Sequence, residues 1–437
     1  MRAVAGGGPG GRLGAVSIAD LSPADLAALH EEQTAAYEQL KAAGLTLDIT
    51  RGKPSAQQLD LSNGLLSLPG DDVRSADGID VRNYGGGTGL TELRQIFGDL
   101  LGVPVDQLVA GDNASLAIMH DTIAFALLHG TVDGDGPWSR QDVKFLCPAP
   151  GYDRHFAICE HFGIEMITID MLDDGPDMTQ VREHVADPAV KGIWLVPTYA
   201  NPTGAVVSDA VARELAELET AAGDFRIFWD NAYAVHHLTD DRQTTADILG
   251  FSAAAGHPHR PFIFASTSKI TLAGSGVSFF GASRENLDWY LAHTAVRTIG
   301  PDKVNQLRHA RFLESPEGVL AHMERHREIL APKFATVLAI LTEKLGPHGV
   351  ASWTEPRGGY FVSLDVVDGT AQRVVQLAKE AGLALTPAGA SFPYGRDPRD
   401  RNIRIAPSFP PLEELRVAIE GLATCVLLAA TEKALAS

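Results

Sequence analysis

Several short polar segments of this 437-residue sequence follow apolar runs and carry side chains that could do chemistry. Lys269 lies among hydroxyl residues after the apolar run 262–265, and Asp230 ends the apolar run 226–229. A lysine in such a place is a candidate Schiff-base amine, because a desolvated ammonium changes its pKa readily. A carboxylate that ends a buried strand needs a cationic partner. Taken singly, each residue also has a structural explanation, namely an exposed lysine or an aspartate that caps a helix.

Three further polar segments lie at comparable places in the sequence. Asn113, Ala114 and Ser115 precede a helix-like pattern that ends at Gly130, and a helix N-terminus offers free N–H groups to a phosphate. Taken alone, this segment is explained more simply as a helix cap. The other two segments are the loop 150–155, with Tyr152, Arg154 and His155, and the turn 201–204, which begins with Asn201.

The elements that must position these residues alternate between short apolar runs and helix-like patterns. Runs that are apolar throughout and bounded by Pro, Gly, Asn or Ser are typical of strands buried on both faces. We therefore predict an α/β fold with a mostly parallel sheet that is covered by helices on both faces. Ligands bind at the carboxyl ends of the strands in such sheets, which is where the polar segments lie. The expected strands are 144–147, 192–196, 226–229, 262–265 and 277–280.

The chain is expected to form two domains after a flexible, glycine-rich tail at residues 1–16. The large domain is predicted to span 75–320, and the smaller α+β domain combines 17–74 with 321–437. A first helix is predicted from Pro23 to about Leu40, with Ser22 as its N-cap. The expected elements of the C-terminal part are helix 322–345, strand 359–364, helix 371–381, strand 402–405 and a helix from 412.

Composition narrows the class of protein. There are 36 Lys and Arg against 55 Asp and Glu, a net charge of −19, which argues against nucleic-acid binding because phosphate neutralisation needs a basic surface. Three cysteines are too few for a disulfide framework, so buried, inert thiols are expected at Cys147, Cys159 and Cys425. No apolar run approaches the ~20 residues of a membrane helix, and the N-terminus lacks a signal-peptide pattern. We expect a cytoplasmic protein.

The set and order of the polar residues carry more information than any one of them. Asp230 follows Asn201 by 29 residues, and Tyr233 and Lys269 follow Asp230 by 3 and 39 residues. This order resembles the aminotransferases of the aspartate aminotransferase fold, which use pyridoxal phosphate, and the resemblance extends from residues 51–55 to Arg404. Three segments resemble an actinobacterial-type subgroup of the aspartate aminotransferases. They are RNYGG at 82–86, WDNAYAVH at 229–236 and IGPDKVNQLRH at 299–309.

The resemblance implies roles for residues around the cofactor ring. Lys269 matches the Schiff-base lysine, and Asp230 matches the anion that keeps the pyridinium nitrogen protonated, which makes the ring an electron sink. Asn201 and Tyr233 match the pair that binds the phenolic oxygen of the ring. Further matches are Tyr152, which stacks on the ring, and His155, which lies behind the aspartate.

The resemblance also implies a phosphate site and a carboxylate site. Arg404 matches the arginine that holds the substrate α-carboxylate in a bidentate fork, and Gly52 matches a glycine that closes over the substrate. Tyr84 matches a tyrosine that reaches the phosphate from the other subunit of a homodimer with its active sites at the interface. The phosphate cup is matched by Asn113, Ala114, Ser115, Ser266 and Ser268.

One position departs from the family pattern. The family usually has a phosphate-binding arginine eight residues after the lysine, and this sequence has Val277 there. Hydroxyl and backbone groups must then hold the phosphate, with Ser275 and Ser268 as candidates, or a cation must come from elsewhere.

The resemblance implies a ping-pong aminotransferase in which Lys269 also moves the substrate proton. Aspartate or glutamate with 2-oxoglutarate or oxaloacetate are the expected substrates, with glutamate and oxaloacetate as the first pair. A dicarboxylate needs a second cation, for which Arg154, Lys303 and Arg51 are candidates. An aminotransferase for aromatic or other amino acids, and a lyase or decarboxylase of the same fold, remain alternatives.

Other interpretations find less support. Residues 266–269 fit the S-x-x-K pattern of penicillin-recognising serine hydrolases, but the chain has no K-T-G element. A transcription regulator with an aminotransferase-like body would need a basic domain in front of the first helix, and the net charge of −19 argues against such a regulator. The glycines of 85–89 lack the G-K-[ST] ending of a phosphate loop. His322 and His326 lack the glutamate of a zinc helix, so no metal site is expected and a solvated helix face is predicted for them.

Overall fold

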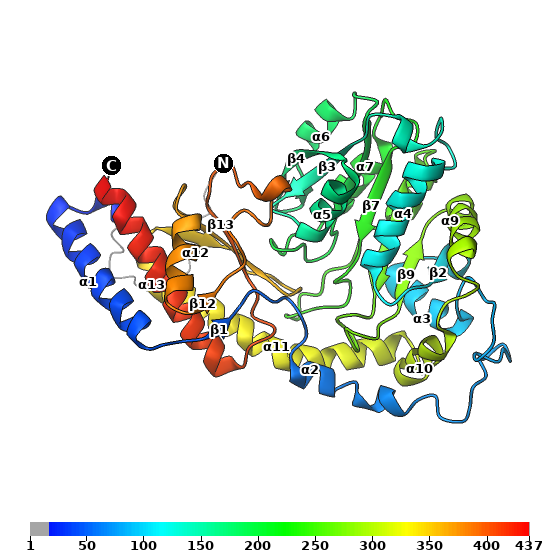
Figure 1. Ribbon diagram of the computed structural model, residues 1–437, viewed down its shortest axis with the longest axis horizontal. Coiled ribbons are helices and arrows are strands. Elements are labelled where there is room, and N and C mark those ends of the chain that lie inside the picture. The colour runs from blue at the N-terminus through cyan, green and yellow to red at the C-terminus, as the bar shows by residue number, and fades with distance from the viewer. Residues whose placement is uncertain (1–16, 437) are drawn as a thin grey trace.

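The computed structural model describes residues 17–436, so the predicted tail at 1–16 lies outside the described residues. An eight-stranded sheet forms the centre of the larger part, in the order β2-β9-β8-β7-β6-β3-β4-β5 (Figure 1). All five strands predicted from apolar runs are present, with ends that differ by no more than two residues. The bounds are β2 Leu108–Ala110, β3 Lys144–Ala149, β4 Glu165–Leu172, β5 Gly175–Pro176, β6 Val190–Leu195, β7 Arg226–Asp230, β8 Pro261–Ser266 and β9 Ser278–Gly281.

The sheet is mostly parallel, as predicted. β3, β4, β6, β7 and β8 run parallel to one another, whereas β9 is antiparallel to both β8 and β2, and β5 is antiparallel to β4. In the register of the central strands, Leu195 pairs with Trp229 and Asp230 pairs with Phe264. The C-terminal ends of β6, β7 and β8 therefore lie side by side, which brings the segments after them together.

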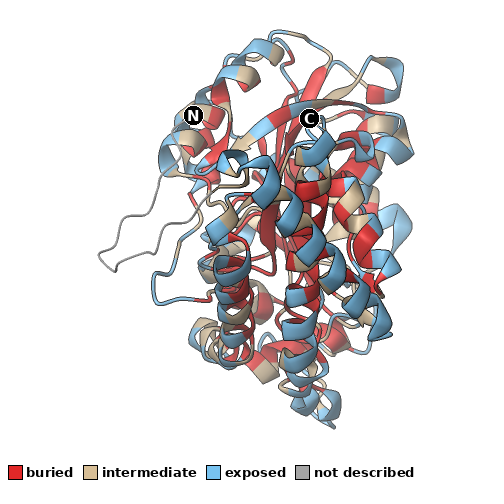
Figure 2. Ribbon diagram, turned by 90° about the vertical axis from the view of Figure 1, so that its left-hand side faces the viewer, coloured by how far each residue is buried: buried red, intermediate tan, exposed pale blue. Residues whose placement is uncertain are grey.

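Helices cover both faces of this sheet, because alternate strand residues point to opposite sides. Ile227 and Trp229 pack into one hydrophobic core, and Phe228 between them packs into another. Figure 2 shows the buried strands enclosed by helices whose outer faces are exposed. On the Phe228 side lie α4 Ser115–His129, α5 Asp153–Phe162 and α9 Arg284–Arg297. On the other side lie α3 Thr91–Leu101, α6 Met178–His184, α7 Asp209–Glu217, α8 Ile248–Ala254 and α10 Lys303–Leu313.

The smaller part combines the N-terminal segment with the C-terminal third of the chain. It contains an antiparallel sheet in the order β10-β11-β13 and a parallel pair in which β1 joins β12. Ser22 caps the first helix as predicted, by accepting the Asp25 N–H. The helices and strands of the smaller part are α1 Pro23–Ala42, β1 Leu47–Asp48, α2 Ala56–Asp60, α11 Pro316–Lys344, β10 Ala351–Trp353, β11 Val362–Val366, α12 Ala371–Glu380, β12 Leu383–Ala384, β13 Asn402–Ile405 and α13 Leu412–Ala436.

The long helix α11 runs beneath both parts of the molecule (Figure 1). Its N-terminal residues Val319 and Met323 belong to a core of the large sheet, whereas Leu330, Phe334 and Val337 belong to the core of the smaller part. α11 therefore connects the two cores. The domain boundaries at residues 75 and 320 remain predictions. None of the helices within residues 17–436 is long and apolar enough to cross a membrane.

One predicted strand begins later than expected. The sequence predicts a strand over 359–364, but β11 spans Val362–Val366. Gly359 has a φ of +86°, a conformation that a strand does not contain. Gly359, Tyr360 and Phe361 therefore form the bend that enters β11, and the Phe361 ring lies beside the Arg404 guanidinium described next.

Candidate active site

A buried histidine–aspartate pair lies at the end of β7. His155 Nε2 and Asp230 Oδ2 are 3.0 Å apart, and the two residues are only 2% and 1% exposed. Trp194 stacks on the His155 ring at 4.5 Å and holds it in place. The other carboxylate oxygen, Oδ1, is also buried and has no hydrogen-bond partner within the described chain. Since buried polar atoms are nearly always paired, this oxygen is suited to an N–H donor of a bound group.

Lys269 follows β8 and lies close to this pair. Its Nζ is 4.9 Å from the centre of the Tyr233 ring. Desolvation lowers the pKa of the Lys269 amine, and the charge of Asp230 opposes that shift. Desolvation therefore favours the neutral amine, which is the form that attacks a carbonyl carbon.

Tyrosine and asparagine side chains surround the same space. Tyr233 is buried, and burial raises the pKa of its phenol well above the usual value, so the hydroxyl keeps its proton. The Tyr152 ring lies edge-on to His155, with centroids 4.9 Å apart. Tyr152, His155 and Asn201 line one small cavity of about 20 Å³. The structure thus brings these three predicted residues together beside Asp230.

Arg404 reaches this group from β13 of the smaller part. Its Nη1 donates to Asp153 Oδ1 at 2.8 Å and to Asn201 Oδ1 at 3.4 Å. Its Nε is buried and finds no hydrogen-bond partner among residues 17–436. One edge of the guanidinium is therefore held by Asp153 while Nε can still donate to a carboxylate. Sequence reasoning missed Asp153, although it stands between two predicted residues, Tyr152 and Arg154.

Gly52 and Arg404 contact the same aromatic ring. The Arg404 guanidinium lies 5.1 Å from the centre of the Phe361 ring. A Cβ atom on Gly52 would lie 2.1 Å from Phe361 Cζ, so the backbone approaches this ring more closely than any side chain would allow. Phe361 was missed at the sequence level, because an aromatic residue in an apolar segment reads as a core residue.

The segments of the predicted phosphate cup converge at Gly276. A Cβ there would lie 2.9 Å from the Asn113 carbonyl oxygen and 3.3 Å from Ser268 Oγ. Helix α4 begins at Ser115, and its N-cap residue, Ala114, has no side chain to accept the first N–H groups. These N–H groups can therefore bind an anion. The Ser268 N–H donates to Ser266 Oγ at 3.4 Å, which links the two predicted serines.

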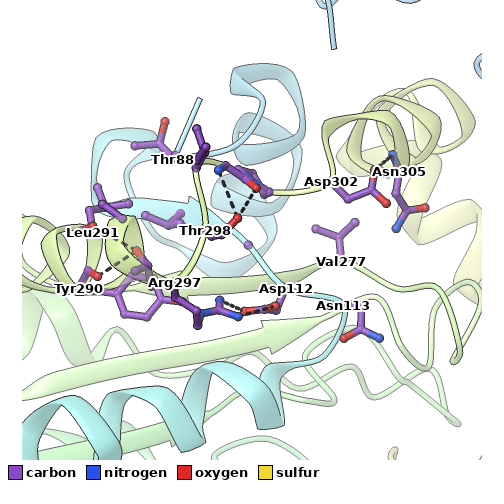
Figure 3. Close-up of a pocket in the computed structure, with 18 of the residues that line it drawn as sticks. Thr88, Asp112, Asn113, Val277, Tyr290, Leu291, Arg297, Thr298, Asp302 and Asn305 are labelled. Atoms are coloured by element: carbon purple, nitrogen blue, oxygen red, sulfur yellow. Dashed lines mark hydrogen bonds and ion pairs between the residues drawn. The ribbon is translucent and has the colours of Figure 1, made fainter. Parts of the chain in front are cut away.

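The Val277 side chain is apolar, so only the backbone of this residue can offer a polar group to the predicted phosphate cup. Its side chain is 1% exposed and packs in a core of the large sheet, and its N–H donates to Thr267 Oγ1 at 2.9 Å. The neighbouring Ser275 lines a cavity of about 910 Å³ together with Asn113 (Figure 3). Arg297 is the one basic residue that lines this cavity in the described structure, and Figure 3 shows it paired with Asp112.

Tyr84 is 81% exposed, and the loop that carries it is fixed by Lys303. Lys303 Nζ donates to the carbonyl oxygens of Asn83 at 2.8 Å and Gly85 at 2.6 Å, and Lys303 is itself buried. Lys303 was a candidate for binding a substrate carboxylate, but its amine is used to hold this loop. The two other candidates are exposed: Arg51 pairs with Asp48 at 2.8 Å, and Arg154 lies in the first turn of α5.

The prediction of a solvated helix face at His322 and His326 is wrong. The two residues are 2% and 0% exposed, because the N-terminal segment 55–62 lies over this part of α11. Gln58 and Ser62 of that segment are hydrogen-bonded to them. The sequence did not reveal this contact, since the partners lie about 260 residues apart. Within residues 17–436 no group of His, Cys, Asp or Glu residues could hold a metal ion.

The three cysteines are free and buried, as predicted. Burial raises the pKa of the Cys425 thiol to about 12 and raises that of Cys147 as well. Neither of these two thiols is activated toward chemistry.

Known proteins resemble this chain over almost its whole length. The family model described as aspartate amino-transferase matches residues 21–437. An aspartate aminotransferase of Corynebacterium glutamicum is 56% identical over 422 residues, which are 96% of this chain and 98% of that protein. A crystal structure of an aspartate transaminase from Corynebacterium glutamicum superimposes with a TM-score of 0.94 at 56% identity, covering 96% of this chain and 99% of that one.

A more distant structure shares the fold alone. It is an α-aminoadipate aminotransferase from Thermus thermophilus, complexed with N-(5'-phosphopyridoxyl)-L-leucine, with 20% identity and a TM-score of 0.71. The alignment covers 88% of this chain and 93% of that one.

Proposed function

Because this chain belongs to the aspartate aminotransferase family, we propose that it transfers the amino group between aspartate or glutamate and their 2-oxo acids, 2-oxoglutarate and oxaloacetate. Aminotransferases of this family use pyridoxal phosphate, and we propose that this chain binds it at Asp230 and Lys269. The observation that carries the proposal is the buried, unpaired Oδ1 of Asp230, since the protonated ring nitrogen of this cofactor is the donor that it lacks.

The residues present fit the cofactor at both of its ends. Asp230 would keep the ring nitrogen protonated, with His155 holding the carboxylate from behind. Asn201 and Tyr233 would bind the phenolic oxygen, and Tyr152 would stack on the ring. When bound, pyridoxal phosphate supplies an electron sink for the carbanion of the substrate. The phosphate would bind at the free N–H groups of α4 and at the hydroxyls of Ser115, Ser266, Ser268 and Ser275, with Asn113 and Ala114 in the same cup.

Each step of the proposed reaction falls to a residue of this chain. Lys269 would hold the cofactor through its amine and, once the amino acid has taken its place there, would move the proton from the α-carbon as a general acid–base. Arg404 holds the α-carboxylate through its unpaired Nε edge, and Gly52 lies across the same Phe361 ring. The amino group and the α-carboxylate of the substrate are thereby held at two points, which orients the α-carbon between them.

The dicarboxylate preference is supported by the 56% identical relative, which is named an aspartate aminotransferase. Arg154 is the candidate for the second carboxylate, because it is exposed and two residues from Tyr152, whereas Lys303 is committed to the Tyr84 loop. The test is a panel of amino donors and oxo acids assayed with the cofactor-loaded enzyme. Aspartate and glutamate are expected to give the highest kcat/KM.

The same panel decides between the alternatives. Release of CO2 or ammonia without an oxo-acid acceptor would identify a decarboxylase or lyase, and a preference for aromatic donors would identify an aromatic aminotransferase. Arg154→Ala is expected to weaken dicarboxylates at least about tenfold more than alanine, by loss of one charge-assisted contact. Equal losses on both substrates would discard Arg154 as the specificity residue.

We also propose that the enzyme is a cytoplasmic homodimer in which Tyr84 reaches the phosphate of the other subunit. Tyr84 is exposed on a loop that Lys303 holds rigid, and the cavity beside Asn113 and Ser275 is open enough to accept such a side chain. Light scattering during size-exclusion chromatography tests the dimer. A monomer that is fully active would contradict this assignment.

A further inference from the structure

Two consecutive backbone carbonyls behind the Lys269 side chain accept hydrogen bonds from buried side chains. Tyr360 Oη donates to the Lys269 carbonyl at 3.4 Å, and His236 Nε2 lies 3.3 Å from the same oxygen. His322 Nε2 lies 2.8 Å from the Ile270 carbonyl, which His326 also contacts. Lys269 and Ile270 lie in a turn after β8, so their carbonyls have no strand partners and depend on these side chains.

The three histidines are uncharged at neutral pH, and the contacts of two of them fix the position of the proton. Burial lowers the pKa of His236 to about 3 and the pKa values of His322 and His326 to about 4. Arg325 Nη2 donates to His322 Nδ1 at 2.7 Å, which leaves the proton of His322 on Nε2. Gln58 Nε2 donates to His326 Nδ1 at 3.0 Å, with the same result. The Nε2–H of His322 therefore points at the Ile270 carbonyl, and His326 Nε2 lies 3.2 Å from His322 Nε2.

Gln58 links this arrangement to the N-terminal segment. Its Oε1 accepts the Ser55 N–H at 3.0 Å, which sets the orientation of the amide. The amide nitrogen then donates both of its hydrogens, to His326 and to Tyr360 Oη at 2.9 Å. Gln58 is fully buried, so neither contact can be replaced by solvent.

The neighbour of Tyr360 connects the same segment to Arg404. Phe361 lies under the Arg404 guanidinium, and Gly52 packs on the Phe361 ring. The segment 52–58 thus touches two consecutive residues. Through Tyr360 it reaches the backbone of Lys269, and through Phe361 it reaches Arg404.

We propose that Gln58, Tyr360 and His326 are positioning residues that fix the Lys269 backbone relative to the segment 52–58 and Arg404. The distance between the Lys269 amine and the Arg404 guanidinium is then fixed. A displacement of the segment 52–58 would therefore also displace Lys269. The inference rests on the proposed function, because it concerns the reach of Lys269 toward the α-carbon. None of the three side chains is assigned a direct part in the reaction.

The test compares Gln58→Leu and Tyr360→Phe with Gln57→Leu, a control on the exposed side of the same helix. Each of the two buried variants is expected to lower kcat about tenfold, as for a reacting group held less accurately, and to leave KM within about twofold. The double variant is expected to lose little more than either single variant, because both break one connection. The pH titration of the visible absorption of the lysine-bound cofactor is expected to shift in both, and to stay unchanged in Gln57→Leu.

The opposite results overturn the inference. If the buried variants lower the melting temperature but keep the kcat and the absorption titration of the control, the network serves stability alone. If Gln58→Leu does not fold, Tyr360→Phe decides, since it removes one oxygen from an otherwise unchanged ring. If the wild-type protein shows no lysine-bound cofactor absorption, the proposed function fails and this inference fails with it. A normal wild-type spectrum with unaffected variants discards the positioning role only.

Discussion

Two lysines of this molecule lie where desolvation lowers the pKa of the amine, yet their surroundings differ. Lys269 lies at the end of a strand of the large sheet, near the carboxylate of Asp230 and the ring of Tyr233. Lys333 lies in α11 beneath the smaller part, and its amine donates to the Ser408 carbonyl at 2.8 Å. Burial alone therefore does not distinguish a reactive lysine. The distinction comes from a carboxylate that opposes the shift and from neighbours with unsatisfied hydrogen-bonding capacity.

The strongest way to break this comparison is to remove the first amine. Lys269→Ala is expected to lower the transamination rate more than about 10⁴-fold, because one group supplies both the covalent link and the proton transfer. The visible absorption of the lysine-bound cofactor should disappear with it. Lys333→Ala serves as the matched control and should keep that absorption. Turnover and absorption that persist in Lys269→Ala would refute the assignment.

Asp230→Asn tests the partner that sets Lys269 apart. Asparagine keeps the shape and one acceptor but removes the charge that would hold the ring nitrogen protonated. We expect kcat to fall about 10²- to 10³-fold, as for other preorganised electrostatic groups, while the cofactor stays on Lys269. Stopped-flow measurement of the half-reaction with glutamate checks this. A kcat within twofold of the wild type would show that Asp230 does not contact the ring nitrogen.

Arg404→Lys tests the opposite end of the site. Lysine keeps the charge but loses the planar fork, along with the contacts to Asp153 and Asn201. The KM for the amino acid is expected to rise about 10- to 100-fold, from the loss of one or two charge-assisted hydrogen bonds. The cofactor spectrum should be unchanged. A fall in kcat at unchanged KM would place Arg404 away from the α-carboxylate.

Sequence reasoning found the two regions with unequal success. The region around Lys269 is made from residues that directly follow buried apolar strands, and such strands can be recognised from an unbroken apolar run such as Phe262–Ala265. β4 was not predicted, because its residues alternate between buried and exposed and its sequence mixes polar with apolar types. The antiparallel direction of β9 is a property of the sheet rather than of its own residues.

The region around Arg404 depends on contacts between distant segments. Asp153 and Phe361 belong to this region only because β13, α5 and the turn before β11 meet in space. The burial of His322 and His326 has the same cause, since Gln58 and Ser62 cover them. Neither the local hydrophobicity nor the spacing of residues predicts such contacts between distant segments. The roles of the predicted site residues remain predictions until the variants above are measured.

The smallest expected effect concerns the second lysine and is one of stability. Lys333 is 4% exposed, and burial lowers its pKa to about 8, from an ordinary value of 10.5. Below pH 8 the amine is charged in both the folded and the unfolded chain, so the folded state bears the whole desolvation cost. Between pH 8 and 10.5 the folded chain releases the proton that the unfolded chain still binds, so stability rises with pH.

Lys333→Met should remove that pH dependence. At about 1.4 kcal/mol per pKa unit, burying the charged amine destabilises the folded wild-type chain by about 3 kcal/mol, and the variant avoids this cost. The variant also loses the hydrogen bond to Ser408, which destabilises it by about 1 kcal/mol. The variant is therefore expected to be more stable at pH 7 by about 2 kcal/mol, a gain that disappears by about pH 10. Urea unfolding at both pH values measures it, and kcat should change far less than in Lys269→Ala. A variant that is less stable at pH 7 would mean that the Ser408 contact outweighs desolvation. Ser408 Oγ donates to the Lys53 carbonyl, so that result would make Lys333 a support of the segment that carries Gly52.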